Sequence, residues 1–247
     1  MLKKLTKVKS ENQVFHPTHP VKVNSSSTRD ILVDPKVGQS FIFGNNITST
    51  VVEIIDGETF RTNNSVYKLE DVQVHIMIDI ECLGIEPGAP VLSIAAIRFT
   101  LDGQYVDSKD KGFYEKISLK DSLDNYGLKV DSDTLKWWAD QDNFKDQLVG
   151  GKPLTKVLGA LRKFIDKEAM VWGNGARFDL GHIAFQYSLT EHAIPWRFSN
   201  ERDVRTIVML NPSIKKDLKF FGTKHDPWDD CIHQILYLTE TYSNVTS

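Results

Sequence analysis

The stretch of sequence that decides the fold is Val74-His75-Ile76-Met77-Ile78-Asp79-Ile80-Glu81. Apolar residues at every second position predict a β-strand. Asp79 and Glu81 are two residues apart, so their side chains project from the same face of that strand. Acidic residues are depleted in strands, and two on one face repel each other unless a cation lies between them. The alternative is that the strand ends here and both carboxylates are solvated, because glycine and proline follow from Gly84 onward.

An α/β pattern continues after this strand. Residues 91–99 are nearly all apolar, as expected for a strand buried on both faces, and a third strand is expected near 112–117. Apolar residues at three- and four-residue steps predict a helix over 154–165. The other expected elements are helical residues 135–138, a strand at 169–172, a helix over 178–189, a short segment near 196–198, and helices over 204–210 and 227–242. Three strands followed by alternating helix and strand predict a mixed sheet flanked by helices.

The first 73 residues lack this pattern. Residues 1–30 are polar and carry a net charge of +4, which predicts a flexible basic arm, either a disordered leader or a tether that contacts phosphates. Residues 31–73 contain short apolar runs joined by tight turns, and Asp56-Gly57 between two β-branched runs is a hairpin signal. We therefore expect a small SH3-like β-barrel at 31–73, ahead of an α/β domain at 74–247. Such a module binds a protein partner or a second copy of the chain, or packs on its neighbour, and the sequence leaves these alternatives open.

Composition is that of an ordinary globular protein of 247 residues, with 40% hydrophobic and 26% charged residues. No apolar run approaches the roughly 18 residues of a membrane span, the first residues do not lead into a signal-peptide core, and two cysteines are too few for a disulfide framework. The cytoplasm is the expected compartment, with no membrane partner. The net charge is −3, so residues 31–247 sum to −7. An acidic body disfavours a broad basic face for nucleic acid, but it is compatible with a site whose positive charge comes from metal.

Two further acidic clusters lie at expected helix starts. Asp179 follows the turn Gly173-Asn174-Gly175 and falls in the first turn of a helix, where an acid that only complements the helix dipole is the alternative. The second cluster is His225-Asp226-Pro227-Trp228-Asp229-Asp230. Asp226 is the expected N-cap, which leaves His225 on a loop outside the helix and Asp230 on its first turn, away from the apolar stripe. In this arrangement a mobile loop would carry His225 as a catalytic base, and a rigid helix would carry Asp230 as a metal ligand.

Together the motifs Asp79-x-Glu81, Asp179 and His225-x4-Asp230 resemble the DEDDh branch of the DnaQ-like 3′-5′ exonucleases. The tracts 133–141 and 202–206 resemble the subgroup of phage exonuclease A and related bacterial 3′-5′ exoribonucleases. The resemblance covers about residues 74–240 and departs from the family pattern at Pro227-Trp228, where small or aliphatic residues are usual. It implies an RNase H-like fold with a mixed five-stranded sheet, and a bacterial or phage-infected cell as the setting.

The resemblance also implies roles for the acidic clusters. Asp79, Glu81, Asp179 and Asp230 would bind two Mg²⁺ or Mn²⁺ ions, for which oxygen ligands are suited. His225 would deprotonate the water that attacks the terminal phosphodiester of single-stranded DNA or RNA, and a nucleoside 5′-monophosphate would leave. The residues expected to contact substrate are Leu83, Gly84, Trp137, Trp138, Asn174 and Arg205.

Several alternatives stay open at this point. We expect at least one of Trp137 and Trp138 to lie in the core. The functional alternative is that a tryptophan forms a surface on which a terminal base stacks. Arg205 neutralises a phosphate or pairs with a nearby acid. The same fold without catalysis would give a nucleic-acid-binding or adaptor protein, and the same site would also suit a hydrolase of small nucleotides.

Overall fold

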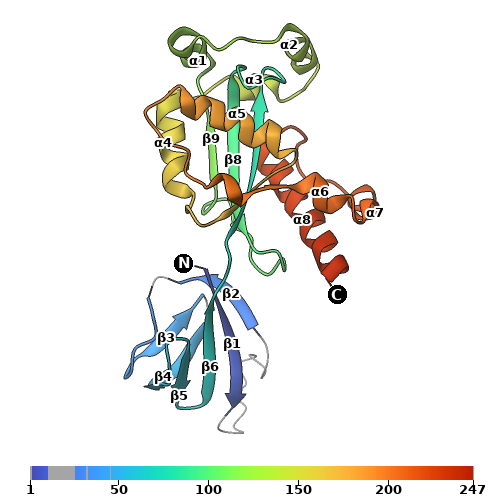
Figure 1. The fold of residues 1–247 in the computed structure, drawn as a ribbon. Helices are drawn as coiled ribbons and strands as arrows, with labels where there is room; N and C mark the ends of the chain where they lie inside the picture. Colours follow the sequence, from blue (N-terminus) through green and yellow to red (C-terminus); the bar gives the residue numbers. More distant parts are fainter. Residues whose placement is uncertain (1, 11–25, 32, 45, 247) are drawn as a thin grey trace. The chain divides into compact units, whose positions relative to one another are not determined.

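The computed structural model describes residues 2–10, 26–31, 33–44 and 46–246, and the chain divides into two units, Met1–Gln73 and Val74–Ser247 (Figure 1). The first unit is a six-stranded antiparallel sheet in the order β2-β1-β6-β5-β4-β3. Its strands are β1 (Leu2–Ser10), β2 (Ser26–Asp30), β3 (Ser40–Phe43), β4 (Asn46–Ile54), β5 (Thr59–Thr62) and β6 (Ser65–Asp71). Its core is formed by Leu5, Phe41, Phe43, Val51, Phe60 and Leu69.

The predicted flexible arm over residues 1–30 is wrong where the chain is described. Leu2–Ser10 and Ser26–Asp30 are paired strands, because Leu2 and Leu5 are buried and the Lys3 ammonium lies 2.8 Å from the Asp71 carboxylate. The part of the arm at 11–25 lies outside the described residues. The strands predicted within 31–73 correspond to β3–β6, but they belong to a larger sheet whose described edges are β2 and β3. The SH3-like barrel is therefore not confirmed.

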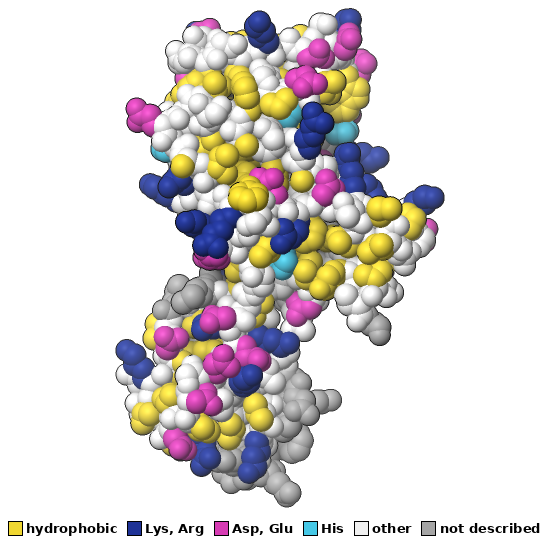
Figure 2. Space-filling view, viewed as in Figure 1, with side chains coloured by type: hydrophobic (Ala, Val, Ile, Leu, Met, Phe, Trp, Pro, Cys, Tyr) yellow, Lys and Arg dark blue, Asp and Glu magenta, His cyan; other side chains and the backbone are white. Residues whose placement is uncertain are grey.

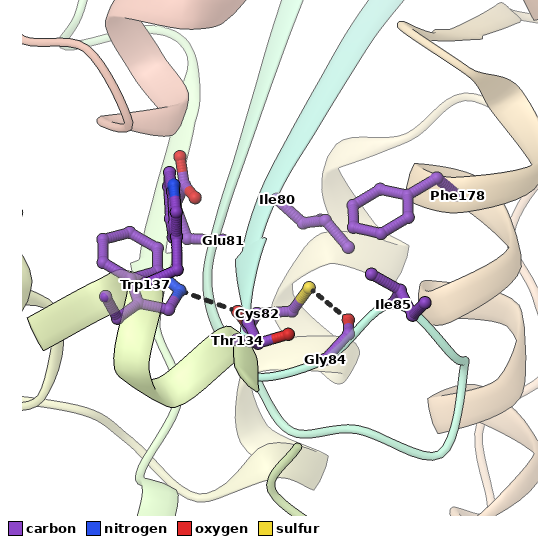
Figure 3. Close-up of a pocket in the computed structure, with 9 residues that line it drawn as sticks. Ile80, Glu81, Cys82, Gly84, Ile85, Thr134, Trp137 and Phe178 are labelled. Atoms are coloured by element: carbon purple, nitrogen blue, oxygen red, sulfur yellow. Dashed lines mark hydrogen bonds between the residues drawn. The ribbon is translucent and has the colours of Figure 1, made fainter. Parts of the chain in front are cut away.

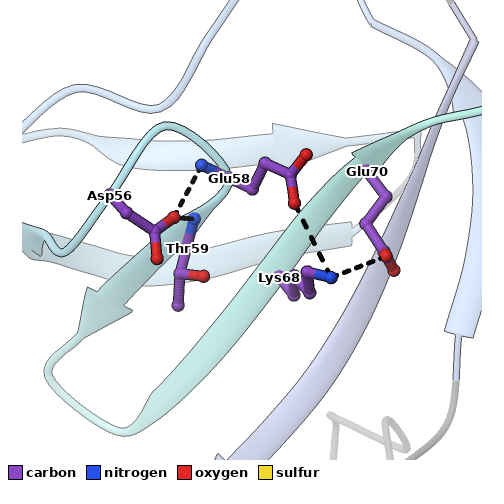
Figure 4. Close-up of polar contacts among 5 residues, drawn as sticks. All are labelled: Asp56, Glu58, Thr59, Lys68 and Glu70. Atoms are coloured by element: carbon purple, nitrogen blue, oxygen red, sulfur yellow. Dashed lines mark hydrogen bonds and ion pairs between the residues drawn. The ribbon is translucent and has the colours of Figure 1, made fainter.

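The Asp56-Gly57 turn joins β4 and β5 as its sequence predicts. The Asp56 carboxylate accepts hydrogen bonds from the backbone N–H groups of Glu58 and Thr59 at 2.8 and 2.6 Å (Figure 4). Beside it, the Lys68 ammonium lies 2.7 Å from Glu70 and 3.6 Å from Glu58. These ion pairs are solvent-accessible and contribute little to stability, so the turn is fixed mainly by its own hydrogen bonds.

The second unit is built on a mixed five-stranded sheet in the order β11-β10-β7-β8-β9, and the predicted α/β architecture is confirmed. Its strands are β7 (His75–Cys82), β8 (Val91–Phe99), β9 (Phe113–Lys116), β10 (Met170–Gly173) and β11 (Glu201–Asp203). β7, β8 and β9 are antiparallel neighbours, whereas β10 and β11 run parallel to β7. The short segment expected near 196–198 overlaps a 3-10 turn, Phe198–Asn200, and the edge strand begins directly after that turn.

Helices cover both faces of this sheet (Figure 1). They are α1 (Leu119–Tyr126), α2 (Ser132–Ala139), α3 (Phe144–Gln147), α4 (Leu154–Phe164), α5 (Ala176–Ser188), α6 (Val204–Val208), α7 (Pro212–Asp217) and α8 (Pro227–Thr246). α4 and α5 pack on the face of β7 that carries Ile76, Ile78 and Ile80, whereas α6 and α8 pack on the face that carries Met77. Because strand side chains alternate, Asp79 and Glu81 lie on the α8 side. No described helix is long and apolar enough to cross a bilayer.

A close approach at Gly151 gives a test of this packing. A Cβ at this position would lie 2.5 Å from the carbonyl group of Ile117, next to the bridge between Ile117 and Lys152. We expect Gly151→Ala to lower the free energy of unfolding by about 1–3 kcal/mol in chemical denaturation, because the obstacle is backbone.

Gly181→Ala is the matched control. A Cβ at Gly181 in α5 meets no atom within 4 Å, and alanine is the better helix former by about 1 kcal/mol. That variant should therefore be as stable as the parent or more stable. Equal losses in the two variants would contradict the packing described for Gly151.

Candidate active site

Asp79 and Glu81 stand on the central strand β7 and face α8. The Gln234 side chain on α8 donates a hydrogen bond of 2.7 Å from Nε2 to Asp79 Oδ1. Glu81 is buried, with 8% of its surface exposed. The cross-strand partner of Asp79 is Ala95 on β8, a small buried residue. The strand therefore continues past both acids, contrary to the solvated strand end considered from the sequence.

Asp179 is brought to the same place by the junction of β10 and α5. Gly175 caps the helix with a φ of 109°, a conformation that favours glycine. A Cβ at Gly173 would lie 2.9 Å from Asp179 Oδ2, so only glycine lets the carboxylate fold back over the strand end. Asp203 at the end of β11 accepts a hydrogen bond of 2.7 Å from the Ala176 backbone N–H. The parallel strands β10 and β11 therefore end next to Asp179.

Asp230 and His225 come from the start of α8. Asp226 is the N-cap, accepting from the backbone of Trp228 and Asp229 at 3.0 and 3.3 Å. Asp230 Oδ2 accepts a hydrogen bond from the His225 backbone N–H at 2.9 Å. Ligand atoms of Glu81, His225 and Asp230 all lie within 4.8 Å of one another. Strand and helix therefore meet in one cluster of metal-type donors.

The His225 loop is held in place, although the sequence suggested a mobile one. His225 has a φ of 61°, a left-handed conformation that is uncommon for a residue with a side chain. Asn143, just before α3, donates from Nδ2 to the His225 carbonyl oxygen at 2.8 Å. The Trp137 ring packs edge-on against the imidazole at 4.8 Å between ring centres. Contacts from two other segments therefore fix the orientation of this histidine.

The electrostatics of the cluster are unfavourable for four free carboxylates. Burial, and then the charges of neighbouring acids, raise the pKa values of Asp79 and Glu81 well above their usual range. Burial raises the pKa of Asp179 to about 7, although hydrogen bonding to the Asn174 backbone and the charge of Arg205 oppose the shift. Burial also raises the pKa of Asp230 to about 6. The four acids thus hold protons more tightly than free carboxyls do.

Divalent cations fit this donor set. Hard cations such as Mg²⁺ and Mn²⁺ prefer carboxylate oxygens, and a bound cation would replace the protons that the acids otherwise retain. The pKa of His225 is lowered by burial and by the charge of Lys224. The imidazole is therefore neutral at neutral pH and able to accept a proton.

An open pocket adjoins the cluster (Figure 3). It is lined by Ile80, Glu81, Cys82, Gly84, Ile85, Thr134, Trp137, Trp138 and Phe178. Trp138 is 1% exposed and donates from Nε1 to the Cys82 carbonyl oxygen at 2.9 Å, so it belongs to the core. Trp137 is 44% exposed, and it lies across the pocket from Phe178. Two aromatic faces therefore flank the space next to Glu81.

The other predicted substrate residues are placed differently from one another. Gly84 lines the pocket, whereas Leu83 is fully buried against Leu92 and Trp138. Asn174 has a buried Oδ1 with no hydrogen-bond partner among the described residues. Arg205 is exposed on α6, and its guanidinium carbon would lie 3.0 Å from a Cβ at Gly175. It thus lies close to the turn that precedes Asp179.

Sequence reasoning missed three residues that shape the site: Gln234, Asn143 and Phe178. Gln234 lies one helical turn after Asp230, and this spacing was a usable signal. Phe178 directly precedes Asp179 and was also within reach. Asn143 contacts a residue 82 positions later, so no local pattern points to it.

Comparison with known proteins was made by sequence and by structure. Residues 74–242 match the Rv2179c-like 3′-5′ exoribonuclease domain. A comparison with curated protein sequences found no match. Among solved structures, Pop2p of S. pombe in its Mg²⁺- and Mn²⁺-bound form matches with a TM-score of 0.52 and 10% identity, over 69% of this chain and 83% of that one.

Two other solved structures are similar. A 3′-exonuclease that recognises the 3′ end of the histone mRNA stem-loop matches with a TM-score of 0.50 and 10% identity, over 70% of this chain and 83% of its own. Cell-death related nuclease 4 (CRN-4) matches with a TM-score of 0.49 and 13% identity. That match covers 70% of this chain and 64% of the nuclease. At these identities the matches to Pop2p and to the 3′-exonuclease support the RNase H-like fold alone.

The fold and the family match together define a 3′-5′ exonuclease of the DEDD type. The match spans more than half of the chain, and the chain belongs to the Rv2179c-like 3′-5′ exoribonuclease domain family.

Metal binding should be visible as stabilisation. At a free Mg²⁺ or Mn²⁺ concentration of about 100 Kd, a ligand that binds only the folded state adds about 2.7 kcal/mol. We expect the Tm to rise with metal in the parent and in Asp133→Asn, an exposed acid of α2. In Asp79→Asn the rise should be much smaller. An equal rise in Asp79→Asn and the parent would show that Asp79 is not a ligand.

The raised pKa of Asp179 predicts a pH dependence of the metal-free protein. The folded carboxyl titrates near 7 and the free group near 3.8, so its stabilising contribution is complete below about pH 3.8 and is lost as the pH rises through about 7. In EDTA, the free energy of unfolding should therefore fall from about pH 5 to about pH 8. Asp179→Asn should reduce this fall and Asp133→Asn should not. A slope that is identical in all three proteins would contradict the burial of Asp179.

Proposed function

We propose that the protein removes nucleotides one at a time from the 3′ end of single-stranded RNA, by a two-metal DEDDh mechanism. The supporting observation is the cluster of Glu81, His225 and Asp230 beside an aromatic pocket, with Asp79 and Asp179 close enough to act electrostatically on the same acids. RNA is the preferred substrate in this proposal because the family is described as exoribonucleases. The tracts at 133–141 and 202–206 support a place near phage exonuclease A.

Each group has a role that its position supports. The four carboxylates would hold two Mg²⁺ or Mn²⁺ ions, which lower the pKa of water and offset charge on the reacting phosphate. His225, neutral and fixed by Asn143 and Trp137, takes the proton of the attacking water. Attack on the terminal phosphodiester breaks the bond to the 3′-oxygen of the penultimate nucleotide. The products are a nucleoside 5′-monophosphate and a shortened strand.

Substrate positioning falls to the pocket and the α5 turn. The terminal base would stack between Trp137 and Phe178, since base–aromatic stacking is tolerant of sequence. Gly84 lines the pocket, and Leu83 packs against Trp138 in the core beneath it. Asn174 supplies a side-chain oxygen that lacks a hydrogen-bond partner among the described residues, and Arg205 offers a positive charge to a phosphate next to the acids.

The direction and chemistry can be tested on labelled strands. We expect 5′-labelled single-stranded RNA to give a ladder that shortens one nucleotide at a time. The 3′-labelled strand should release only labelled mononucleotide, and EDTA should abolish both reactions. DNA strands assayed in parallel measure the preference for the 2′-hydroxyl. Internal cuts, or activity that survives EDTA, would refute the proposal.

His225→Asn should lower kcat by roughly 10²–10⁴, the range for loss of a general base. The described contacts of the His225 side chain are with the Trp137 and Trp138 rings, whereas its backbone makes the bonds to Asp230 and Asn143, so the metal-induced rise in Tm should remain. His192→Asn is the matched control, because His192 contacts Thr155 on α4, on the opposite face of the sheet. Full activity of the His225→Asn variant would show that His225 is not the general base.

A further inference from the structure

The segment from Asn211 to Lys224, between α6 and α8, carries a charge that the rest of its unit lacks. Residues 74–247 contain 21 basic and 25 acidic residues, a net charge of −4. The segment itself holds four lysines and one acid, Asp217, so it is +3 in an otherwise acidic unit. The lysines are Lys215, Lys216, Lys219 and Lys224, all exposed. Within the described part of the chain, none of the four forms an ion pair.

This segment is anchored along the helix that carries Asp230. At its start, the Lys215 ammonium lies over the Tyr237 ring at 5.1 Å. In the middle, the Phe220 ring packs against His233 at 4.9 Å. Near its end, the Thr223 backbone N–H donates to Asp229 at 2.8 Å. Since a helix rises about 1.5 Å per residue, the lysines extend about 10 Å along α8 away from the metal cluster.

An exposed aromatic ring accompanies the lysines. Phe221 is 69% exposed, although its neighbour Phe220 packs against α8. The Lys219 ammonium lies 5.5 Å from the centre of the Phe221 ring. Gly222 follows with a φ of 106°, and a Cβ there would lie 2.5 Å from the Asp229 carboxylate. A tight turn therefore leaves the Phe221 ring in solvent.

Basic and hydrophobic side chains gather around α7 on the face shown in Figure 2. A solvated basic face would account for the lysines alone, but it does not account for an exposed phenylalanine among them. Lysines interleaved with an exposed aromatic ring are typical of surfaces that bind single-stranded nucleic acid. The segment ends directly before His225, so a strand lying on it would lead to the reacting phosphate.

We propose that Lys215, Lys216, Lys219, Lys224 and Phe221 form a track for the part of the substrate strand that lies 5′ of the cleaved nucleotide. This inference rests on the proposed function and extends it to residues outside the pocket. The lysines contact successive phosphates and Phe221 stacks on one base. The terminal nucleotide occupies the pocket between Trp137 and Phe178, and the strand passes His225 and continues along α8.

The charge contribution is tested with the triple variant Lys215→Ala, Lys216→Ala, Lys219→Ala. Lys224 is left intact because its charge acts on His225. The matched control is Lys156→Ala, Lys163→Ala, Lys167→Ala, three exposed lysines on or next to α4. Binding of a fluorescent single strand of about twelve nucleotides, within the usual site sizes, is measured by anisotropy with Ca²⁺ in place of Mg²⁺. The salt concentration is varied in each titration.

We expect the triple variant to bind the strand at least tenfold more weakly than the control. The slope of log K against log salt should fall by about 2, which corresponds to about 0.7 for each lost phosphate contact. In Mg²⁺, the ratio of kcat/KM for the long strand to that for a dinucleotide should fall by a similar factor. Phe221→Ala should weaken strand binding by about fivefold or more, and Phe221→Trp should restore it.

The outcomes separate this inference from the proposed function. Equal affinities and equal salt slopes in the triple variant and the control would overturn the track, whatever the enzyme cleaves. Strand binding that depends on the lysines, without any Mg²⁺-dependent cleavage by the parent, would keep the track and overturn the exonuclease proposal. If Phe221→Trp binds the strand no better than Phe221→Ala does, the proposed stacking of a base on Phe221 is wrong.

Discussion

Repulsion among four neighbouring carboxylates, two buried and two half-buried, is the constraint on which this structure depends. Asp79 and Glu81 share one face of the central strand, and Asp179 and Asp230 approach from two helix starts. Without a cation, burial of Asp79 and Glu81 and the charges of neighbouring acids favour their protonated forms, and burial raises the pKa of Asp179 to about 7. The fold therefore assembles a site that is most stable when divalent cations occupy it. Stability and metal affinity are two consequences of the same arrangement.

Helix α8 links this constraint to the rest of the unit. Its apolar face, with Cys231, Ile235 and Leu238, packs against the sheet. The same turns present Asp230 to the cluster and Gln234 to Asp79. A shift of the helix along the sheet would therefore move the Asp230 carboxylate and the Gln234 amide together. The N-cap Asp226 fixes where the helix begins, and so where the His225 loop must end.

The sequence predicted those parts of the fold and site that local patterns encode. Alternation in 74–81 identified the central strand and its acidic face, and the Asp226-Pro227 pair located the start of α8. Strand β1 was missed because its lysines masked the buried Leu2 and Leu5. Strand β11 is too short to show an alternation of apolar and polar residues. The hold of Asn143 on the His225 loop is a contact between distant segments, and only the folded chain reveals it.

Charge placement explains how an acidic protein can act on a polyanion. A uniformly basic surface would bind nucleic acid anywhere along its length, whereas the reaction requires a strand end at one point. In the second unit Asp79, Glu81, Asp179 and Asp230 concentrate negative charge, and four exposed lysines that form no ion pair within the described part of the chain lie on the segment that precedes His225. If the proposed track holds, the attraction of phosphates is local, and a strand would be favoured where its end reaches the acidic cluster. The overall net charge of −3 is thus compatible with a nuclease.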